Sequence, residues 1–431
     1  MRTRWLALTI VLGLAALCFA RPVPGDVFRE YKWWNEGGDA GGSLRVGGKH
    51  GQEHPDRGWA HDYINAPVVL EHEFDLKHAI RAEVVIEKIL CHECTTGLAI
   101  EVNGNRWTRV PEAEAIPYPQ WDYQHHIYPV VPVPLSFLKA GEGNRFRMRV
   151  DPEHPWNWPQ NLIYGVHFRV YYDPTKKAHP TGKIVSLESG DTIGRTVRLE
   201  VDTEDEVDRV DYVGHYEDVN YEGDGLYRQW HYHFFHGDLV HHIGSATEAP
   251  FRVDWDTSWV PDQTQPMAIA ARITDSSGMT YITEAVTDLV LKREGLSVEL
   301  CKPYDIPKKW VTRAGEKTER FNVTGDLEDA VAARLCWSSW SPGYMRGVSI
   351  NGTKVFDTEG PNYQYYFHRV PVSRMDVFKE GVNTLTTGKT PKIDGHMVHG
   401  MEVNWPGIMV LIRYEDTKQT EDSEDDTGAD R

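Results

Sequence analysis

The chain has 431 residues and a formal net charge of −18 at neutral pH, with 40% hydrophobic and 26% charged residues. A chain of this length is long enough for two or three domains. Its acidic balance disfavours nucleic acid and anionic lipid as partners. It also disfavours anionic glycans, unless a local basic patch or a bound cation intervenes.

The first 20 residues have the organisation of a secretory signal peptide. Arg2 and Arg4 precede an apolar core from Leu6 to Leu17, and the segment ends in a small-x-small cleavage site at Ala20. This core is too short to cross a bilayer comfortably, and no other stretch approaches the roughly 20 apolar residues that a membrane span needs. We therefore expect a secreted protein with no membrane insertion.

Four cysteines follow the signal peptide, and an even count in an exported protein favours disulfides. Cys301 and Cys336 flank one predicted domain, and we predict that they pair. Cys91 and Cys94 belong to a CHEC motif that could form a short loop staple. A zinc site there would need a second ligand pair, and the sequence has no second CxxC motif. The pairing of Cys91 and Cys94 stays open.

Short alternating or β-branched segments between Gly, Asn, Asp and Pro turns predict strands almost throughout. No long segment keeps a helical apolar period. Two stretches repeat one pattern in the same order. The first contains "AIEVNGNRW", "VPVPLSFLKAGEGNRFRMRV" and "NWPQNLIYGVHFRVYYD", and the second contains "GVSINGTKVF", "VPVSRMDVFKEGVNTLTTGK" and "NWPGIMVLIRYED". We predict an all-β protein in which residues 22–173 and 295–415 form two related jelly-roll-like β-sandwiches.

Between the two copies, residues 182–293 carry strand patterns of a different kind, about seven in number, which predict an immunoglobulin-like β-sandwich. The acidic end of the chain, residues 416–431, is predicted to be a disordered tail.

The repeated unit resembles the galactose-binding-domain-like modules of bacterial extracellular carbohydrate-active proteins. Its Asn-Gly turn, its "VPVPLSFLKAGEGNRF" segment and its "YGVHFRVYYD" last strand carry this resemblance. The central unit resembles bacterial immunoglobulin-like modules through "GHYEDVNYEGDGLYRQWHY" and "PFRVDWDTSWVPDQ". Together the resemblances cover nearly all of the chain after the signal peptide, and they imply a role in binding carbohydrate.

The segment "HYHFFHGDLVHH", residues 231–242, contains five of the chain's 20 histidines. Alternation along a strand places His231 and His233 on one face and large aromatic side chains on the other. We expect the aromatic face to be buried and the two histidines to face outward. The aromatic residues are Trp230, Tyr232 and Phe234.

The same segment predicts a hairpin. A two-residue turn at 237–238 would place His233 opposite His242, and a loop that includes His236 would place it opposite His241. Together with His231, either pairing would bring three imidazoles within reach of one another, which suits copper or zinc. The alternative is a set of polar side chains on the wet face of a sandwich.

The preceding loop, "EDVNYEGDG", suits calcium. Asp218, Asn220, Glu222 and Asp224 stand at alternate positions, and oxygen ligands with this spacing are typical of Ca²⁺ sites. The twelfth position is Gln229, where an EF-hand has a bidentate Glu. The prediction is therefore a calcium loop on a sandwich, and the alternative is a polar turn.

The 15 tryptophans are numerous, and several lie in loop-like contexts such as "DPEHPWNWPQN" and "CWSSWSPGY". Exposed rings stack on the C–H faces of sugars, so a glycan platform is predicted in each outer sandwich. The alternative is core packing. The candidates in the first sandwich are Tyr123, His125, His126, Trp156 and Trp158. Those in the second are Trp337, Trp340, Tyr363, His396 and His399.

These observations favour a secreted protein that binds extracellular carbohydrate without catalysis, with the central unit setting the distance between the outer sandwiches. No nucleophile elbow, zinc-protease motif, P-loop or dinucleotide fingerprint is present. Two other classes stay open. One is a copper- or zinc-dependent extracellular enzyme, acting on polysaccharide or by oxidation, although a whole domain separates the two sandwiches in sequence. The other is a structural or adhesive surface protein.

Overall fold

A computed structural model describes residues 22–34, 44–46, 67–89, 97–149, 161–203, 205–396 and 399–415. The predicted signal peptide and acidic tail lie outside these residues, as do Cys91, Cys94, Trp156 and Trp158. The described elements are strands with a few short 3-10 helices, so the predicted all-β fold is confirmed. Within the described residues, no helix is long and apolar enough to span a bilayer.

The N-terminal unit, residues 22–172, consists of two sheets around one apolar core. One sheet places β10 between β1 and β4, with β7 and β8 beyond β4, and the other has the order β3-β9-β5-β6. β10 is buried along its whole length because it has sheet neighbours on both sides and packed layers on both faces. The strands are β1 (Val27–Trp34), β2 (Leu44–Val46), β3 (Val68–Val69), β4 (Ala79–Ile89), β5 (Ala99–Val102), β6 (Thr108–Arg109), β7 (His126–Ile127), β8 (Val130–Val133), β9 (Arg145–Arg149) and β10 (Asn161–Tyr172). The 3-10 helices are η3 (Gln120–Asp122) and η4 (Leu135–Phe137).

The C-terminal unit, residues 296–415, has the same strand order in its two sheets: β24-β32-β26-β29 and β25-β30-β27-β28. Its core is a separate apolar cluster. The strands are β24 (Leu296–Cys301), β25 (Lys317–Val323), β26 (Ala330–Trp340), β27 (Val348–Ile350), β28 (Thr353–Phe356), β29 (Tyr365–Val372), β30 (Gly381–Thr387), β31 (Glu402–Val403) and β32 (Met409–Glu415). The 3-10 helices are η5 (Thr312–Ala314), η6 (Leu327–Asp329), η7 (Pro342–Tyr344) and η8 (Met375–Val377).

The central unit, residues 183–291, surrounds a third core. Its longest strands, β15 and β21, pair with each other, and β20 pairs with β13 on the opposite side of that core. The strands are β11 (Lys183–Ile184), β12 (Thr192–Ile193), β13 (Thr196–Leu199), β14 (Val201–Asp202), β15 (Arg209–Glu217), β16 (Arg228–His231), β17 (His233–Phe235), β18 (Asp238–Val240), β19 (Gly244–Ala246), β20 (Val253–Asp256), β21 (Met267–Thr274), β22 (Met279–Ile282) and β23 (Val286–Leu291).

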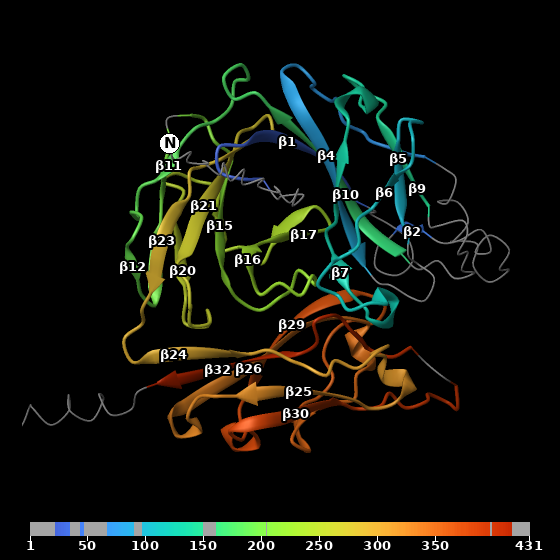
Figure 1. Cartoon of the computed structure of the whole chain (residues 1–431), viewed down its shortest axis with the longest axis vertical. Helices are drawn as coiled ribbons and strands as arrows, with labels where there is room; N and C mark the ends of the chain where they lie inside the picture. The colour runs from blue at the N-terminus through green and yellow to red at the C-terminus, as the bar shows by residue number, and fades with distance from the viewer. Residues whose placement is uncertain are drawn as a thin grey trace, which may run out of the picture.

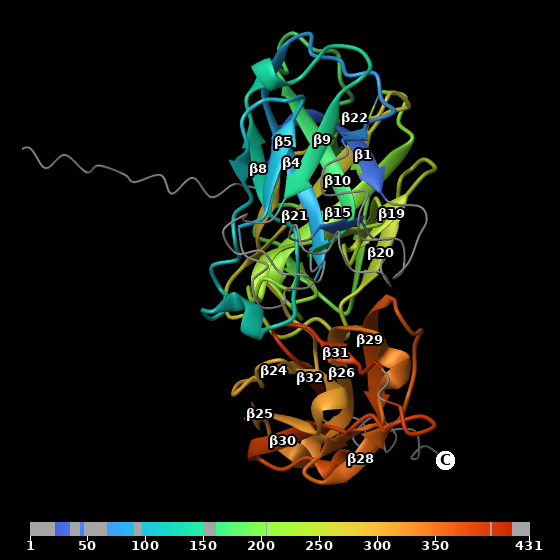
Figure 2. The same ribbon diagram turned by 90° about the vertical axis from the view of Figure 1, so that its right-hand side faces the viewer.

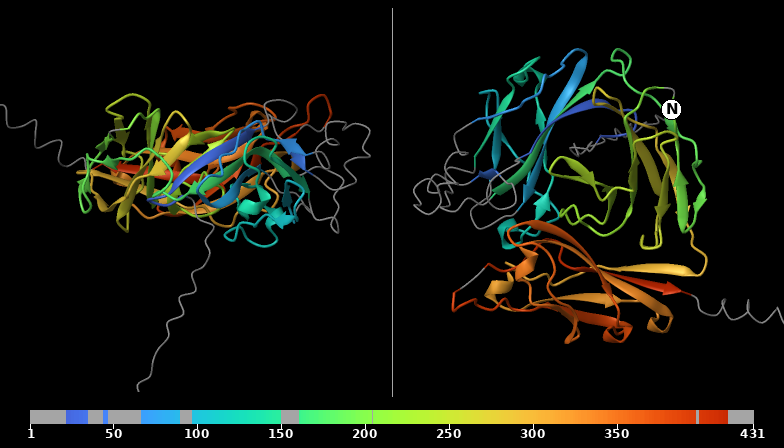
Figure 3. Two further views of the ribbon diagram at one scale, coloured as in Figure 1. Left: turned by 90° about the horizontal axis from the view of Figure 1, so that it is seen from above. Right: turned by 180° about the vertical axis from the view of Figure 1, so that it is seen from behind.

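The N-terminal and central units share one sheet. β1 pairs with β22, which joins the two units into a 13-stranded sheet that curves around β17, with its own strand β16 on the inner side of the curve (Figures 1 and 3). Tyr232 packs inside this curve against Phe28 of β1 and Tyr171 of β10. The shared sheet holds the hairpin segment between two units, and residues 231–234 are buried there.

The C-terminal unit lies across the end of both other units (Figures 1 and 2). The backbone N–H of Trp405 donates to the carbonyl of Gln124 at 2.7 Å, and that of Lys309 donates to the carbonyl of Asp122 at 2.6 Å. The prediction that the central unit keeps the outer sandwiches apart is therefore wrong. The two outer units are far apart in sequence but touch in space, because the chain returns to the N-terminal unit after β24.

Cys301 and Cys336 are free thiols, so the predicted disulfide between them is wrong. Cys301 pairs with Val410 and Cys336 with Met409, on opposite sides of the same strand, β32. Two strand spacings, about 9–10 Å, separate them, which exceeds the roughly 7 Å that a disulfide allows. Because adjacent residues of β32 face opposite ways, Cys301 lies in the core of the C-terminal unit and Cys336 faces the central unit.

Candidate functional site

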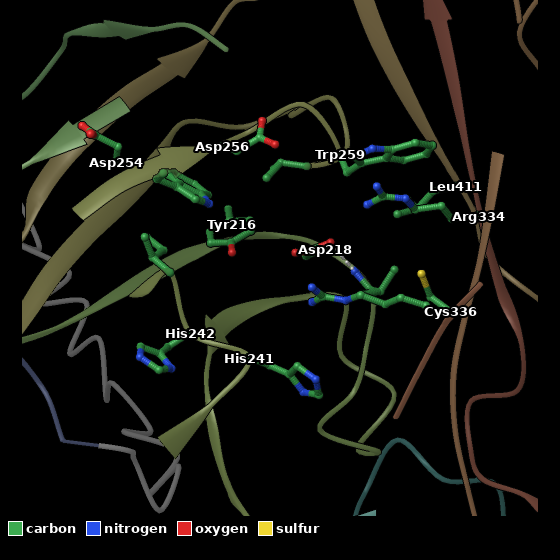
Figure 4. A pocket seen from close by; sticks show the side chains of 15 residues that line it. Tyr216, Asp218, His241, His242, Asp254, Asp256, Trp259, Arg334, Cys336 and Leu411 are labelled. Atoms are coloured by element: carbon green, nitrogen blue, oxygen red, sulfur yellow. Dashed lines mark hydrogen bonds between the residues drawn. The ribbon is translucent and has the colours of Figure 1, made fainter. Parts of the chain in front are cut away.

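A pocket of about 330 Å³ lies between the central and C-terminal units (Figure 4). Three segments of the central unit and three strands of the C-terminal unit contribute to it. The central segments are the end of β15, the connection from β18 to β19, and β20 with the turn after it. The lining residues are Tyr216, Asp218, Val219, His241, His242, Ile243, Asp254, Trp255, Asp256, Trp259, Val260, Arg334, Cys336, Arg369 and Leu411.

Strand pairing brings the charged groups of the C-terminal unit to one place. Arg334 and Cys336 are two residues apart on β26, so both face the central unit. Arg369 of β29 pairs with Cys336, and Leu411 of β32 pairs with Arg334 on the other side. This sheet face therefore presents two guanidinium groups beside a small apolar surface.

Trp259 forms one wall of the pocket, and two arginines, Arg334 and Arg413, lie against its ring. The guanidinium of Arg334 lies 3.8 Å from the centroid of the Trp259 ring, and that of Arg413 lies 5.2 Å from it. Trp255 is only 7% exposed and packs against Tyr216 at 5.4 Å between ring centroids. The indole of Trp259 therefore orients Arg334, whereas Trp255 belongs mainly to the core of the central unit.

Asp218 and Arg369 face the same space from opposite units. Burial raises the pKa of Asp218, and the nearby charges of His231 and Arg369 offset this only in part. The Nε–H of Arg369 donates to the hydroxyl of Tyr221 at 3.3 Å, and that hydroxyl donates to the carbonyl of His368 at 2.8 Å. These contacts fix one edge of the Arg369 guanidinium.

Behind the pocket, histidines from two units surround one phenylalanine of the third. The rings of His126, His233 and His241 lie 6.2, 5.3 and 4.5 Å from that of Phe367. Burial lowers the pKa values of His126 and His241 well below the ordinary range, so both are neutral at physiological pH. Nε2 of His126 lies 3.5 Å from the buried carboxyl of Glu87, whose pKa burial raises. This cluster packs the three units together.

The hairpin differs from its predicted form. Tyr232 and Phe234 are buried as predicted, and Trp230 is half-buried. His231 and His233, expected to face outward, are 3% and 2% exposed. Alternation separated the two faces correctly, but the second face meets another unit and is buried too.

The turn of the hairpin lies one residue earlier than predicted. His236 and Gly237 occupy it, both with positive φ, as a type I′ turn requires. His233 therefore pairs with Val240, and neither His241 nor His242 stands opposite it.

The four candidate copper or zinc ligands do not meet at one point. His231 contacts the carboxylate of Glu222 at 3.2 Å and the carbonyl of Tyr216 at 2.9 Å. His242 contacts the hydroxyl of Ser245 at 2.6 Å. Only His233 and His241 lie side by side, at 4.8 Å between ring centroids. Within the described part of the chain, no group of three or more His, Cys, Asp or Glu side chains has the arrangement of a metal site.

The predicted calcium loop is closed by its own hydrogen bonds. The side-chain amide of Asn220 donates to Asp224 at 2.8 Å, and the Asn220 oxygen accepts from the N–H of Gly225 at 2.9 Å. Asp224 also accepts from Gln229, and Glu222 faces His231. Calcium binding by this loop stays a prediction.

The predicted platforms are mostly interior residues. His125 and His126 are fully buried, Trp337 is fully buried against His368, and Trp340 is 4% exposed, so the prediction of exposed rings at these positions is wrong. The tryptophans lie in strand β26, where the sequence suggested a loop. Tyr123 is half-buried against Trp405. Tyr363 is 46% exposed near the half-buried His399, and His396 is exposed.

Sequence reasoning missed Trp259, Arg334 and Arg369 as site residues. One signal could have found the two arginines: Arg334 stands in "AARLCW" and Arg369 in "FHRVPV", and each is a lone charge within an apolar strand pattern. Such a charge marks a strand face that meets either solvent or a polar site.

No known protein family and no curated protein matches the sequence. Among solved structures, fibronectin(III)-like modules of CbhA from Clostridium thermocellum share 15% identity at a TM-score of 0.17, over 26% of this chain and 98% of that one. A glycoside hydrolase family 86 β-porphyranase from Bacteroides plebeius shares 12% identity at 0.21, over 56% and 38%. The ANXUR2 extracellular domain from Arabidopsis thaliana shares 8% identity at 0.18, over 87% and 89%. Similarities with such low TM-scores carry no argument about function, and this chain spans little more than a third of the porphyranase.

Proposed function

We propose that the protein is secreted and binds carbohydrate outside the cell through the pocket between its central and C-terminal units. The observation that carries this proposal is the composition of the pocket wall. Aromatic rings, carboxylates, guanidinium groups and imidazoles converge there from two units. Aromatic surface suits the C–H faces of a sugar, and the polar groups suit its hydroxyls.

The size of the pocket fits this class of ligand. Its volume of about 330 Å³ is at the lower end of the roughly 300–1,000 Å³ that small-molecule sites occupy. A site of this size accommodates a short saccharide or the end of a longer chain. Because the ligand would touch both units, binding would also reinforce their contact.

Calorimetric titration of the purified protein with oligosaccharides selected on a glycan array tests this proposal. Trp259→Phe and Asp256→Ala alter the pocket wall and should each weaken binding by roughly tenfold, the cost of about one lost polar or stacking contact. Tyr118→Ala is a matched control, because Tyr118 is 86% exposed outside the pocket.

Tyr363→Ala separates the pocket from the predicted platform of the C-terminal unit. If the pocket is the binding site, this variant retains its affinity. Loss of binding in Tyr363→Ala, together with normal binding in Trp259→Phe, would show that the binding site is the surface near His399 and not the pocket. All variants need an unchanged melting temperature for this comparison.

A second candidate function rests on Asp218. A carboxyl with a raised pKa in a pocket is a typical general acid. If the protein hydrolyses the saccharide it binds, Asp218→Asn should abolish turnover and retain binding. Product analysis by mass spectrometry after incubation with the bound oligosaccharide tests this directly.

A further inference from the structure

We infer that the pocket selects saccharides that carry an acidic group, a carboxylate or a sulfate, and that Arg334 and Arg369 together bind this group. This inference rests on the proposed carbohydrate binding and specifies its substrate class.

The two arginines stand at the spacing of a joint site. Arg334 pairs with Pro371, two residues after Arg369 on β29, so the arginines are diagonal neighbours on adjacent strands. Diagonal Cα atoms lie about 7–8 Å apart, and the long arginine side chains can bring their guanidinium groups to one anion. Both belong to the pocket wall, Arg369 exposed and Arg334 half-buried.

Neither arginine has a protein carboxylate as its partner. Among the described residues, no Asp or Glu lies within salt-bridge distance of Arg334 or Arg369, whereas Arg198, Arg293 and Arg374 each have one. Arg334 donates no hydrogen bond to a described residue, and Arg369 donates only to Tyr221. The remaining N–H groups are free to form the paired hydrogen bonds that guanidinium makes with carboxylate or sulfate oxygens.

Their surroundings hold these donors in place before a ligand arrives. Trp259 stacks on the plane of Arg334, and Tyr221 accepts from Nε of Arg369. The Nη edge of Arg369 is thereby left for a ligand. Fixed donors lose less side-chain entropy on binding, so more of each contact contributes to affinity.

Asp218, Asp254 and Asp256 also line the pocket, but none of the three forms an ion pair with Arg334 or Arg369. Asp254 already pairs with Arg198 at 3.0 Å, and burial raises the pKa of Asp218. The net charge of −18 acts on the pocket mainly from a distance. At physiological ionic strength the field of an exposed charge fades over about 8 Å, so salt screens most of this effect. On the face of the C-terminal sheet, Arg334 and Arg369 therefore form the local basic patch that an acidic protein needs to bind an acidic glycan.

The test uses matched oligosaccharides on the full-length protein. Oligogalacturonates are compared with their carboxyl-reduced forms, and sulfated galactans with their desulfated forms, by calorimetry at low and at physiological salt. We expect at least one acidic form to bind roughly ten- to hundredfold more tightly than its neutral counterpart. This preference should shrink as salt is raised.

Variants then assign the preference to the two arginines. Arg334→Met and Arg369→Met should each reduce the ratio of acidic to neutral affinity by roughly tenfold. Arg374→Met is the matched control, because Arg374 is exposed and pairs with Asp376 away from the pocket. If Arg334→Met unfolds the protein, Arg334→Lys replaces it in the test. Lysine keeps the positive charge but lacks the paired N–H donors of the guanidinium group, so this variant should still lower the ratio of acidic to neutral affinity.

The outcomes separate the two proposals. If neutral and acidic forms bind equally well, or if the arginine variants keep the wild-type ratio, the acidic selectivity is wrong and carbohydrate binding stands. If no saccharide binds in any form, the proposed function itself is wrong. If inorganic sulfate binds at the pocket but no sulfated saccharide does, the inference is also wrong.

Discussion

The side-chain amide of Asn103, in the turn after β5, donates a hydrogen bond at 2.8 Å to Oδ1 of Asn144, the residue before β9. Asn144 also accepts from the backbone N–H of Lys139 and donates to its carbonyl. Asn351 and Asn383 repeat this arrangement in the C-terminal unit, with the amide of Asn351 2.7 Å from Oδ1 of Asn383 and the same two bonds to a preceding lysine. One network thus ties the Asn-Gly turn to the following hairpin in both units.

We therefore expect Asn144→Ala and Asn383→Ala to destabilise the protein by similar amounts, about 1–3 kcal/mol each. Both side chains are fully buried, so truncation leaves their partners unsatisfied. Urea denaturation gives the change in unfolding free energy. Asn322→Ala, at an exposed position, serves as control and should change it by less than about 0.5 kcal/mol. A large effect at only one of the two asparagines would show that the shared network does not have a shared structural role.

Gly223 tests the contact between the central and N-terminal units. Its φ is +71°, and a Cβ there would lie 2.0 Å from the carbonyl oxygen of His126. Gly223→Ala should cost more than the roughly 1–2 kcal/mol of a left-handed alanine, because a backbone atom must also move. Gly352→Ala is the matched control, because Gly352 has a similar φ of +84° but a Cβ added there would have no atom within 4 Å. Equal losses of unfolding free energy in the two variants would contradict this close packing of the units.

The buried histidines predict an acid-sensitive protein. Burial lowers the pKa values of His125 and His368, each to about 3, whereas an unfolded chain has histidine pKa values near 6.5. The unfolded state therefore binds more protons as pH falls below about 6.5, so stability is full above that pH and is lost toward pH 3. Each such histidine contributes at most about 1.4 kcal/mol per pH unit.

Denaturation at several pH values between 7 and 4 measures this slope. His125→Gln cannot take up the proton, so we expect a shallower loss of stability than in the wild type. His396→Gln replaces an exposed histidine and should leave the wild-type slope unchanged. The explanation fails if His125→Gln and the wild type lose stability at the same rate.

The two free cysteines should be inaccessible to thiol reagents while the protein is folded. Cys301 and Cys336 are 2% and 1% exposed, and burial raises the pKa of Cys336 to about 11. Neither should react with a thiol reagent in the folded protein, and both should react after denaturation without a reducing agent. Peptide mapping by mass spectrometry identifies the alkylated residues. A peptide pair linked through Cys301 and Cys336 would contradict the strand register around β32.

Several features of the fold could be predicted from the sequence because they depend on local pattern. Alternating apolar residues and turn residues predicted strands, and the order of the repeated segments predicted related outer units, whose sheets share one strand order. The Asn-Gly turn of the repeated unit begins at Asn103 in one copy and at Asn351 in the other, and both residues have the positive φ that such a turn requires. Side-chain size and alternation also predicted the burial of Tyr232 and Phe234.

The tertiary structure alone decided which strand faces meet. A period of two assigns His231 and His233 to one face of a strand, but it does not say whether that face meets water or another unit. Likewise, the sequence separation of Cys301 and Cys336 does not indicate that β32 lies between them. Arg334 and Arg369 become one candidate site only because β26 pairs with β29 and the resulting face packs on the central unit. Burial depends on contacts between residues far apart in the chain, and a local sequence pattern carries no information about those partners.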